Sequence, residues 1–284
     1  MDGAEEYNPD DFFGTPEKPI ELDTLVVEGE RKFIASMDAI KSQVQLPPDS
    51  ITLKLFPILT TEEAVRMAAH VYGDKTDDIL TGGWRVSDRK FEGVKYDNED
   101  TGLKSMLYER VVDGNVTEYA YVTAGTEDGK DWKFGNLTQP FGFSKQYKQA
   151  SKNAEKISNA LGFNVLTFIG HSLGGGLAAL NALSTNRSAI TFNPAGVSEI
   201  TKLVDGGLKA YFRREKTRID AYVMITDPLY TLQNKLLKGI IPDVNGKMHK
   251  LFPTDFPSVY NGHSIDNILK NFGIRNPQKY NKPK

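Results

Sequence analysis

The segment GHSLG at residues 170–174 is the part of the sequence best suited to chemistry. The apolar run VLTFI at 165–169 precedes it and predicts a buried strand, and the small residues of 175–180 predict a closely packed helix. Strand, G-x-S-x-G and helix are the setting of a nucleophile elbow, in which a sharp turn exposes a serine hydroxyl. The pattern therefore predicts that Ser172 attacks a carbonyl carbon; a serine that merely caps the helix is the alternative.

A serine hydroxyl is a weak nucleophile unless a neighbouring base takes its proton. Two histidines follow Ser172 in the chain. His263 lies in a predicted turn, from which a side chain can reach a strand end, and we favour it as the base. His249 lies in an alternating basic segment typical of a strand and is the alternative. The remaining histidines, His70 and His171, are expected to be structural.

The base needs an acidic residue that orients it, and the acid is expected at the same edge of the sheet as the serine. Asp227 comes at the end of a predicted strand over 218–226 and is the first choice. Asp220 lies near the start of that strand, at the opposite edge, and Asp243 in a predicted loop is the second choice. Asp227 could alternatively cap a predicted helix over 229–237.

A second donor for a developing oxyanion is predicted upstream of the serine. The segment AGTE ends a predicted strand, and it can place the N–H and hydroxyl of Thr126 opposite the N–H of Leu173. The next residues interleave aromatic and polar side chains, among them Trp132 and Phe134. Such a segment can cover a pocket and lift at a lipid surface, although an ordinary surface loop is the alternative.

The remaining chain alternates predicted helices and strands, which is typical of a mainly parallel sheet covered on both faces. Thr60 and Glu63 have the spacing of a capping box for a helix that runs to residue 71. An Asp-Gly turn predicts a hairpin of two edge strands before the parallel core. The other expected elements are helices at 143–161, 198–204 and 265–272 and a strand at 188–194.

Composition limits the class of protein. The chain has 284 residues, 39% of them hydrophobic and 25% charged, and a single α/β domain can fill this length. No apolar run is long enough for a transmembrane helix, and the acidic N-terminus does not resemble a classical signal peptide. The absence of cysteine excludes disulfides and thiol catalysis, and we expect no metal, cofactor or nucleic-acid partner.

Charge is distributed unevenly along the chain. Residues 1–30 contain ten acidic residues and one lysine, a balance of −9, whereas residues 201–284 contain fifteen basic and seven acidic residues, a balance of +8. We predict an acidic leader or linker over 1–45 and a hydrolase domain over 46–284. A basic surface near the site would favour an anionic substrate surface such as a phospholipid leaflet.

Together these motifs resemble the class 3 (fungal-type) lipase family over residues 121–263. The resemblance implies an α/β-hydrolase fold, a triad of Ser172, Asp227 and His263, and Thr126 as an oxyanion-hole residue. It also implies that Asp131-Trp132 and Asn136-Leu137 belong to a lid, so that Trp132, Phe134 and Leu137 would contact substrate. The sequence departs from the family at Ala124, where an arginine is common, and in its lack of cysteine pairs.

These features predict a serine ester hydrolase that acts through an acyl-enzyme on a lipid, either as a phospholipase of the A type or as a lipase. The segment at 19–27 resembles one found ahead of the working domains of exported Bacteroidetes proteins. We therefore expect an antibacterial effector, made in the bacterial cytoplasm, delivered by a specialised secretion system and matched by an immunity protein. A housekeeping triacylglycerol lipase or carboxylesterase and a non-catalytic hydrolase-fold binding protein are the alternatives.

Overall fold

The computed structural model describes residues 59–125, 144–207, 210, 217–233, 242–254 and 262–274, together with two short strands near the N-terminus. Contacts divide the chain into two units, Met1–Phe56 and Pro57–Lys284. In the first unit, β1 (Gly14–Thr15) pairs with β2 (Lys18–Pro19) in antiparallel orientation. The boundary expected at residue 45 stays a prediction.

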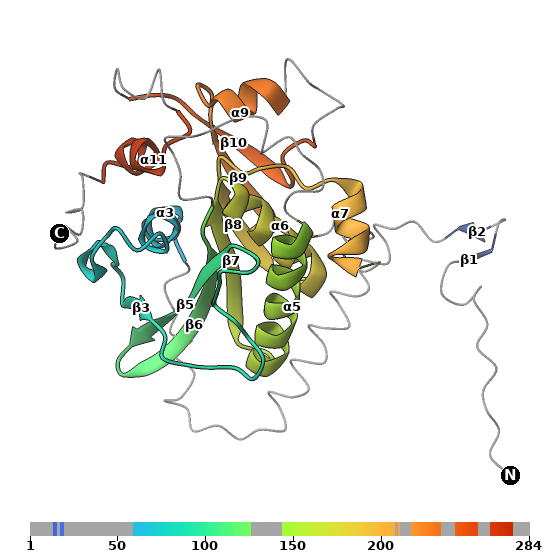
Figure 1. Ribbon diagram of the computed structural model, residues 1–284, viewed down its shortest axis with the longest axis horizontal. Coiled ribbons are helices and arrows are strands. Elements are labelled where there is room, and N and C mark those ends of the chain that lie inside the picture. The colour runs from blue at the N-terminus through green and yellow to red at the C-terminus, as the bar shows by residue number, and fades with distance from the viewer. Residues whose placement is uncertain are drawn as a thin grey trace, which may run out of the picture. The chain divides into compact units, whose positions relative to one another are not determined.

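The second unit is built on an eight-stranded sheet in the order β10-β9-β8-β7-β6-β5-β3, with β4 paired to β5 (Figure 1). The strands are β3 (Trp84–Val86), β4 (Asp97–Asn98), β5 (Leu103–Val112), β6 (Asn115–Thr123), β7 (Val165–His171), β8 (Ser188–Phe192), β9 (Ile219–Met224) and β10 (Lys247–Leu251). Strands β6 to β10 pair in parallel, whereas β5 pairs antiparallel with β6 and with β3. The mainly parallel α/β class is confirmed.

The hairpin of β5 and β6 forms where the sequence predicts it, but its expected place at the edge of the sheet is wrong for both strands, since β3 and β4 pair with the other side of β5. Strand β7 pairs with β6 in parallel, so β6 is an internal strand. Its residues are buried on both faces, Tyr119 and Tyr121 in one core cluster and Ala120 and Val122 in the other. The short strand β3, which was not predicted from the sequence, pairs with the outer side of β5.

Helices cover both faces of the sheet, as the two core clusters and Figure 1 show. Helices α5 (Ser144–Leu161) and α6 (Leu173–Thr185) lie on one face, and α3 (Thr61–His70) and α11 (Ile265–Asn271) lie on the other. The shorter described helices are η1 (Asp77–Ile79), α7 (Glu199–Val204) and α9 (Pro228–Thr231). Among the described helices, none combines the length and apolar character needed to cross a bilayer.

Helix α3 is anchored at its first turn. The hydroxyl of Thr60 accepts the backbone N–H of Glu63, and the Glu63 carboxylate accepts the N–H of Thr60, so the predicted capping box is confirmed. The same carboxylate pairs at 2.7 Å with Arg110 on β5, a side chain that is almost completely buried. These bonds hold the first turn of the helix on the sheet.

Candidate active site

Ser172 lies in a strained turn between β7 and α6. Its backbone dihedral angles are φ 58° and ψ −127°, a conformation that is rare for a residue with a side chain. The flanking glycines are needed because the helix turns back closely onto the strands: a Cβ on Gly170 would collide with Gly174, and a Cβ on Gly174 would collide with Thr123 at the end of β6. The turn has the geometry of a nucleophile elbow.

His263 bridges the serine and the aspartate. Its Nε2 lies 2.8 Å from Ser172 Oγ, and its Nδ1 lies 3.0 Å from both carboxylate oxygens of Asp227. An ionised carboxylate can only accept hydrogen bonds, so Nδ1 carries the imidazole proton and Nε2 has a lone pair directed at the serine hydroxyl. All three residues are buried, with Asp227 only 1% exposed.

Asp227 serves two structural purposes at once. One carboxylate oxygen accepts the backbone N–H of Leu229 at 2.8 Å and so caps α9, while both oxygens face the imidazole of His263. The two interpretations that the sequence left open for this residue are therefore compatible. A bond to the backbone locks the carboxylate in the orientation in which it can hold the histidine.

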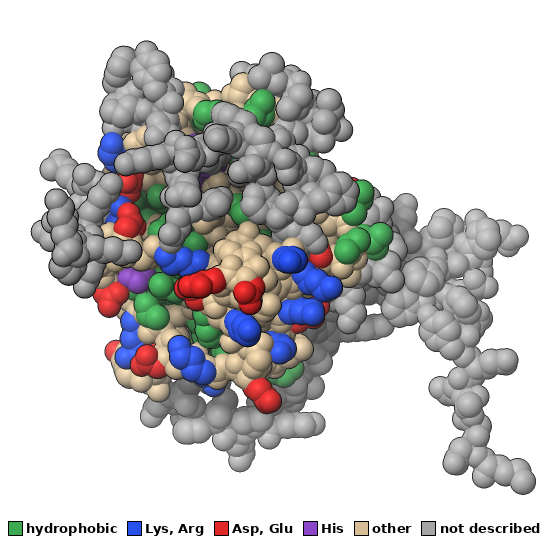
Figure 2. Space-filling model, in the orientation of Figure 1, with side chains coloured by type: hydrophobic (Ala, Val, Ile, Leu, Met, Phe, Trp, Pro, Cys, Tyr) green, Lys and Arg blue, Asp and Glu red, His purple; other side chains and the backbone are tan. Residues whose placement is uncertain are grey.

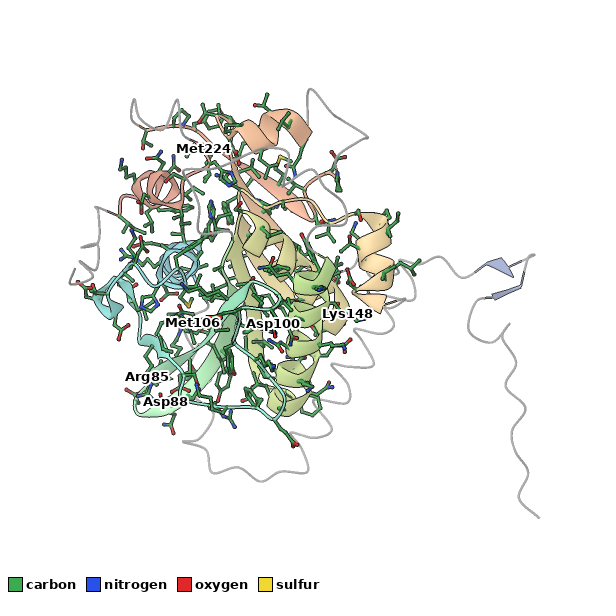
Figure 3. The ribbon with its side chains drawn as sticks, in the orientation of Figure 1. Arg85, Asp88, Asp100, Met106, Lys148 and Met224 are labelled. Atoms are coloured by element: carbon green, nitrogen blue, oxygen red, sulfur yellow. The ribbon has the colours of Figure 1, made fainter. Side chains whose placement is uncertain are left out.

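The order of the strands explains why a loop histidine is needed. Ser172 follows β7 and Asp227 follows β9, with β8 between them. Neighbouring strands lie about 4.8 Å apart, so the two strand ends are roughly 10 Å apart and their side chains need a bridging ring. Met224, labelled in Figure 3, marks the carboxyl end of β9 at which the site is assembled.

Two buried side chains contact the backbone around His263. The side-chain amide of Asn193, directly after β8, donates to the Gly262 carbonyl at 2.7 Å, and His171 Nε2 lies 2.7 Å from the carbonyl oxygen of His263 itself. The sequence predicted a structural role for His171, without a partner, and no role for Asn193. A usable signal for His171 was its position inside the elbow motif, because the residue before the nucleophile is also carried to the end of β7.

Only part of the predicted oxyanion hole lies in the described part of the chain. Leu173 is the first residue of α6, where backbone N–H groups have no partner within the helix, and its side chain is buried. Thr126 and the predicted lid residues Trp132, Phe134 and Leu137 lie outside the described residues. The preceding Gly125 is described, and its N–H donates to the hydroxyl of Tyr72 at 3.1 Å.

The alternative base, His249, is paired with Asp220, the aspartate expected at the opposite edge of the sheet, and not with Ser172. His249 on β10 lies 2.8 Å from a carboxylate oxygen of Asp220 and stacks on Tyr222. Asp220 is near the start of β9, whereas Ser172 lies beyond the end of β7. Within the described residues, neither His249 nor Asp243 is hydrogen-bonded to Ser172.

The chain resembles known phospholipases in sequence. The family described as "Phospholipase-like: Tle-like phospholipase domain" matches residues 63–258, a range that contains Ser172 and Asp227 and ends before His263. A protein named "Extracellular phospholipase A1" from Serratia liquefaciens is 39% identical over 118 residues, which are 41% of this chain and 36% of that protein. The chain thus spans about a third of the length of this curated relative.

Two solved structures resemble the chain more distantly. A triacylglycerol lipase from Penicillium expansum matches with a TM-score of 0.46 and 13% identity, over 70% of this chain and 80% of that one. A mutant form of MDLA from Penicillium cyclopium matches with a TM-score of 0.41 and 15% identity, over 70% and 82% of the two chains.

Proposed function

Because this chain belongs to the Tle-like phospholipase domain family, we propose that it hydrolyses a carboxylic ester of a phospholipid through an acyl-enzyme on Ser172. The observation that carries the proposal is the continuous hydrogen-bonded line from Ser172 Oγ through His263 to Asp227. A nucleophile, a base and an orienting carboxylate in this arrangement perform acyl transfer on several unrelated folds.

In the proposed reaction, Ser172 Oγ attacks the ester carbonyl carbon while His263 Nε2 takes the hydroxyl proton. Asp227 stabilises the imidazolium that forms, and the N–H of Leu173 donates to the oxyanion. The bond from the carbonyl carbon to the alcohol oxygen then breaks, and His263 returns the proton to the departing alkoxide. A water molecule, deprotonated by the same nitrogen, then attacks the acyl carbon; the bond from this carbon to Ser172 Oγ breaks, His263 returns the proton to Oγ, and the fatty acid is released.

A phospholipid is the proposed substrate class for two reasons. The relative from Serratia liquefaciens is named a phospholipase A1, which suggests cleavage at the sn-1 position. Four exposed lysines also follow one side of α5 at helical spacing: Lys145, Lys148, Lys152 and Lys156. Figure 2 shows lysine and arginine side chains gathered over this helix, and such a row favours an anionic headgroup surface.

The test measures fatty-acid release from phosphatidylglycerol, phosphatidylethanolamine and triacylglycerol by the native chain and by Ser172→Ala. We expect release from phospholipid that falls by roughly 10⁴-fold or more in the variant. Lipids with different acyl chains at sn-1 and sn-2 identify the bond, and release of the sn-1 chain is expected. Release from triacylglycerol alone would instead support the housekeeping lipase, and no release from a folded protein would contradict the proposal.

We also propose that the protein is exported and delivered to a target cell. The relative is named an extracellular protein, which supports export, and the segment at 19–27 suggests a specialised route with an inhibitory partner. The test directs the native chain or Ser172→Ala to the periplasm of a susceptible bacterium and follows growth. Growth arrest and membrane lipid loss with the native chain alone are expected; equal growth would contradict an effector role.

A further inference from the structure

The loop that carries His263 is held by two consecutive carbonyl groups. The Gly262 carbonyl accepts the amide of Asn193, and the His263 carbonyl lies against His171 Nε2, each at 2.7 Å. Asn193 and His171 are buried, and they come from the ends of the neighbouring strands β8 and β7. The catalytic ring therefore projects from a backbone segment tied to the sheet on both sides of its Cα.

Both polar atoms of the Asn193 side chain are hydrogen-bonded. Its side-chain oxygen accepts the N–H of Met224 at the end of β9, while its amide nitrogen donates to Gly262. Its backbone has a φ of 41°, a conformation that asparagine tolerates better than most residues. One side chain thus joins the strand that leads to Asp227 with the loop that carries His263.

The direction of every proton around His171 follows from its partners. A carbonyl oxygen only accepts, so His171 Nε2 carries a proton, and in the neutral ring Nδ1 is then an acceptor. The Tyr72 hydroxyl, 2.9 Å from Nδ1, must donate to it, and the Tyr72 oxygen in turn accepts the N–H of Gly125 at 3.1 Å. The chain of bonds runs without a break from Gly125 to the carbonyl of His263.

The ring of His171 is kept neutral. Burial, and then the charge of the nearby His263, lower its pKa to about 3. In the neutral ring, Nδ1 keeps a lone pair that can accept the proton of the Tyr72 hydroxyl. The centroids of the two rings are 5.1 Å apart, so a charge on His171 would also oppose the formation of an imidazolium at His263.

We propose that His171 and Asn193 are positioning residues that hold His263 in reach of Ser172, and that Tyr72 connects His171 to the backbone at Gly125. The proposal rests on the proposed function, because it gives these side chains a role in the same acyl transfer. A displacement of about 1 Å at a reacting group can cost about 10²-fold in rate. Two tied carbonyls on either side of the His263 Cα limit such a displacement.

The test compares kcat and KM for a soluble p-nitrophenyl ester in four variants. Asn193→Asp keeps the acceptor for Met224 but places an oxygen against the Gly262 carbonyl, and we expect kcat to fall about 10- to 100-fold with KM within about twofold. His171→Leu should show a similar fall. His171→Gln restores a donor near the Nε2 position and should recover part of the lost rate, whereas Tyr72→Phe should cost less than His171→Leu.

A matched control is available in the same molecule. His70 is also a buried histidine bonded to a tyrosine hydroxyl, that of Tyr108 at 2.8 Å, but no described contact links it to His263. His70→Gln should lower the melting temperature and leave kcat unchanged. A pH series adds a second readout: protonation of the new carboxyl in Asn193→Asp restores a donor, so its deficit relative to the native chain should shrink as pH falls.

The outcomes separate this proposal from the proposed function. An inactive native chain would contradict the proposed function itself. An active native chain with folded His171→Leu and Asn193→Asp variants of native kcat would overturn the positioning roles. An equal loss of kcat in His70→Gln would overturn them too, since the effect would then report general stability. A KM increase without a change in kcat would contradict positioning as well.

Discussion

Two histidine–aspartate pairs lie at strand β9, and only one of them faces a nucleophile. Asp220 and His249 are 2.8 Å apart, and Asp227 and His263 are 3.0 Å apart, so the two hydrogen bonds are alike in length. The first pair lies toward the start of the strand and the second just beyond its end. Their surroundings differ: the side chain of Asp220 is 19% exposed, and that of Asp227 is 1% exposed.

The difference shows that the pair alone does not make a site. The ring of His249 stacks on Tyr222, and Asp220 also pairs with Arg218. The His249–Asp220 pair therefore joins the neighbouring strands β10 and β9 at the surface. His263 uses its second nitrogen for Ser172, and Asp227 is bonded to the backbone of α9. In parallel sheets, the carboxyl ends of strands gather side chains at one edge, and Ser172 lies at that edge.

The largest expected difference between the pairs is in catalysis. Asp227→Asn removes the acceptor that selects the tautomer of His263, and we expect kcat to fall by about 10⁴-fold. Asp220→Asn changes the matching bond of the other pair and should leave kcat within about twofold. Initial rates on phosphatidylglycerol vesicles check both. A similar loss in the two variants would mean that the surface pair takes part in the reaction.

A smaller effect is expected when the glycine that precedes each histidine is replaced by alanine. A Cβ on Gly262 would collide with Thr226 and approach the backbone nitrogen of Asp227, so Gly262→Ala should displace His263 and lower kcat about 10- to 100-fold. A Cβ on Gly246, before β10, would collide with Ile219, and its φ of 91° disfavours alanine. Gly246→Ala should therefore lower the melting temperature, and kcat measured below that temperature should be unchanged. A loss of kcat in Gly246→Ala would contradict the view that only the Asp227–His263 pair takes part in catalysis.

The smallest effect is the contribution of the surface pair to stability. Burial raises the pKa of Asp220, but the bonds from His249 and Arg218 outweigh it, so the folded pKa lies below the usual value. The carboxylate therefore stabilises the fold above its unfolded pKa of about 3.9, and this contribution is lost as pH falls through the folded pKa. Asp220→Asn should lower the melting temperature by about 1–3 °C at pH 6, with the difference vanishing near pH 2.

Much of the architecture was predictable because it depends on local patterns. The capping box at Thr60 and Glu63, the hairpin around Asp113, and the strand before Ser172 each follow from spacing and turn chemistry. The place of β6 inside the sheet was not predictable in this way. It depends on which strand pairs with it, and a strand with apolar residues on both faces is compatible with several neighbours.

In the site, too, some residues were predicted from local sequence and others were found only in the structure. Motif context singled out Ser172, and position relative to predicted strands favoured Asp227 and His263 over their alternatives. The positioning roles proposed for His171, Asn193 and Tyr72 were not predicted from the sequence. Each of these side chains acts through a backbone atom of a distant segment, and backbone atoms leave no trace in residue types.

The sequence by itself determined the turn at Ser172, the fold class and the family, because glycine spacing and hydrophobic period act over short distances. Only the tertiary structure decided which histidine meets the serine. His249 and His263 each have an aspartate within hydrogen-bond distance, and because β7, β8 and β9 run in parallel, only the pair beyond the carboxyl end of β9 lies at the edge that carries Ser172. The pairing and direction of strands are long-range properties, and they bring together residues that lie 91 positions apart in the chain.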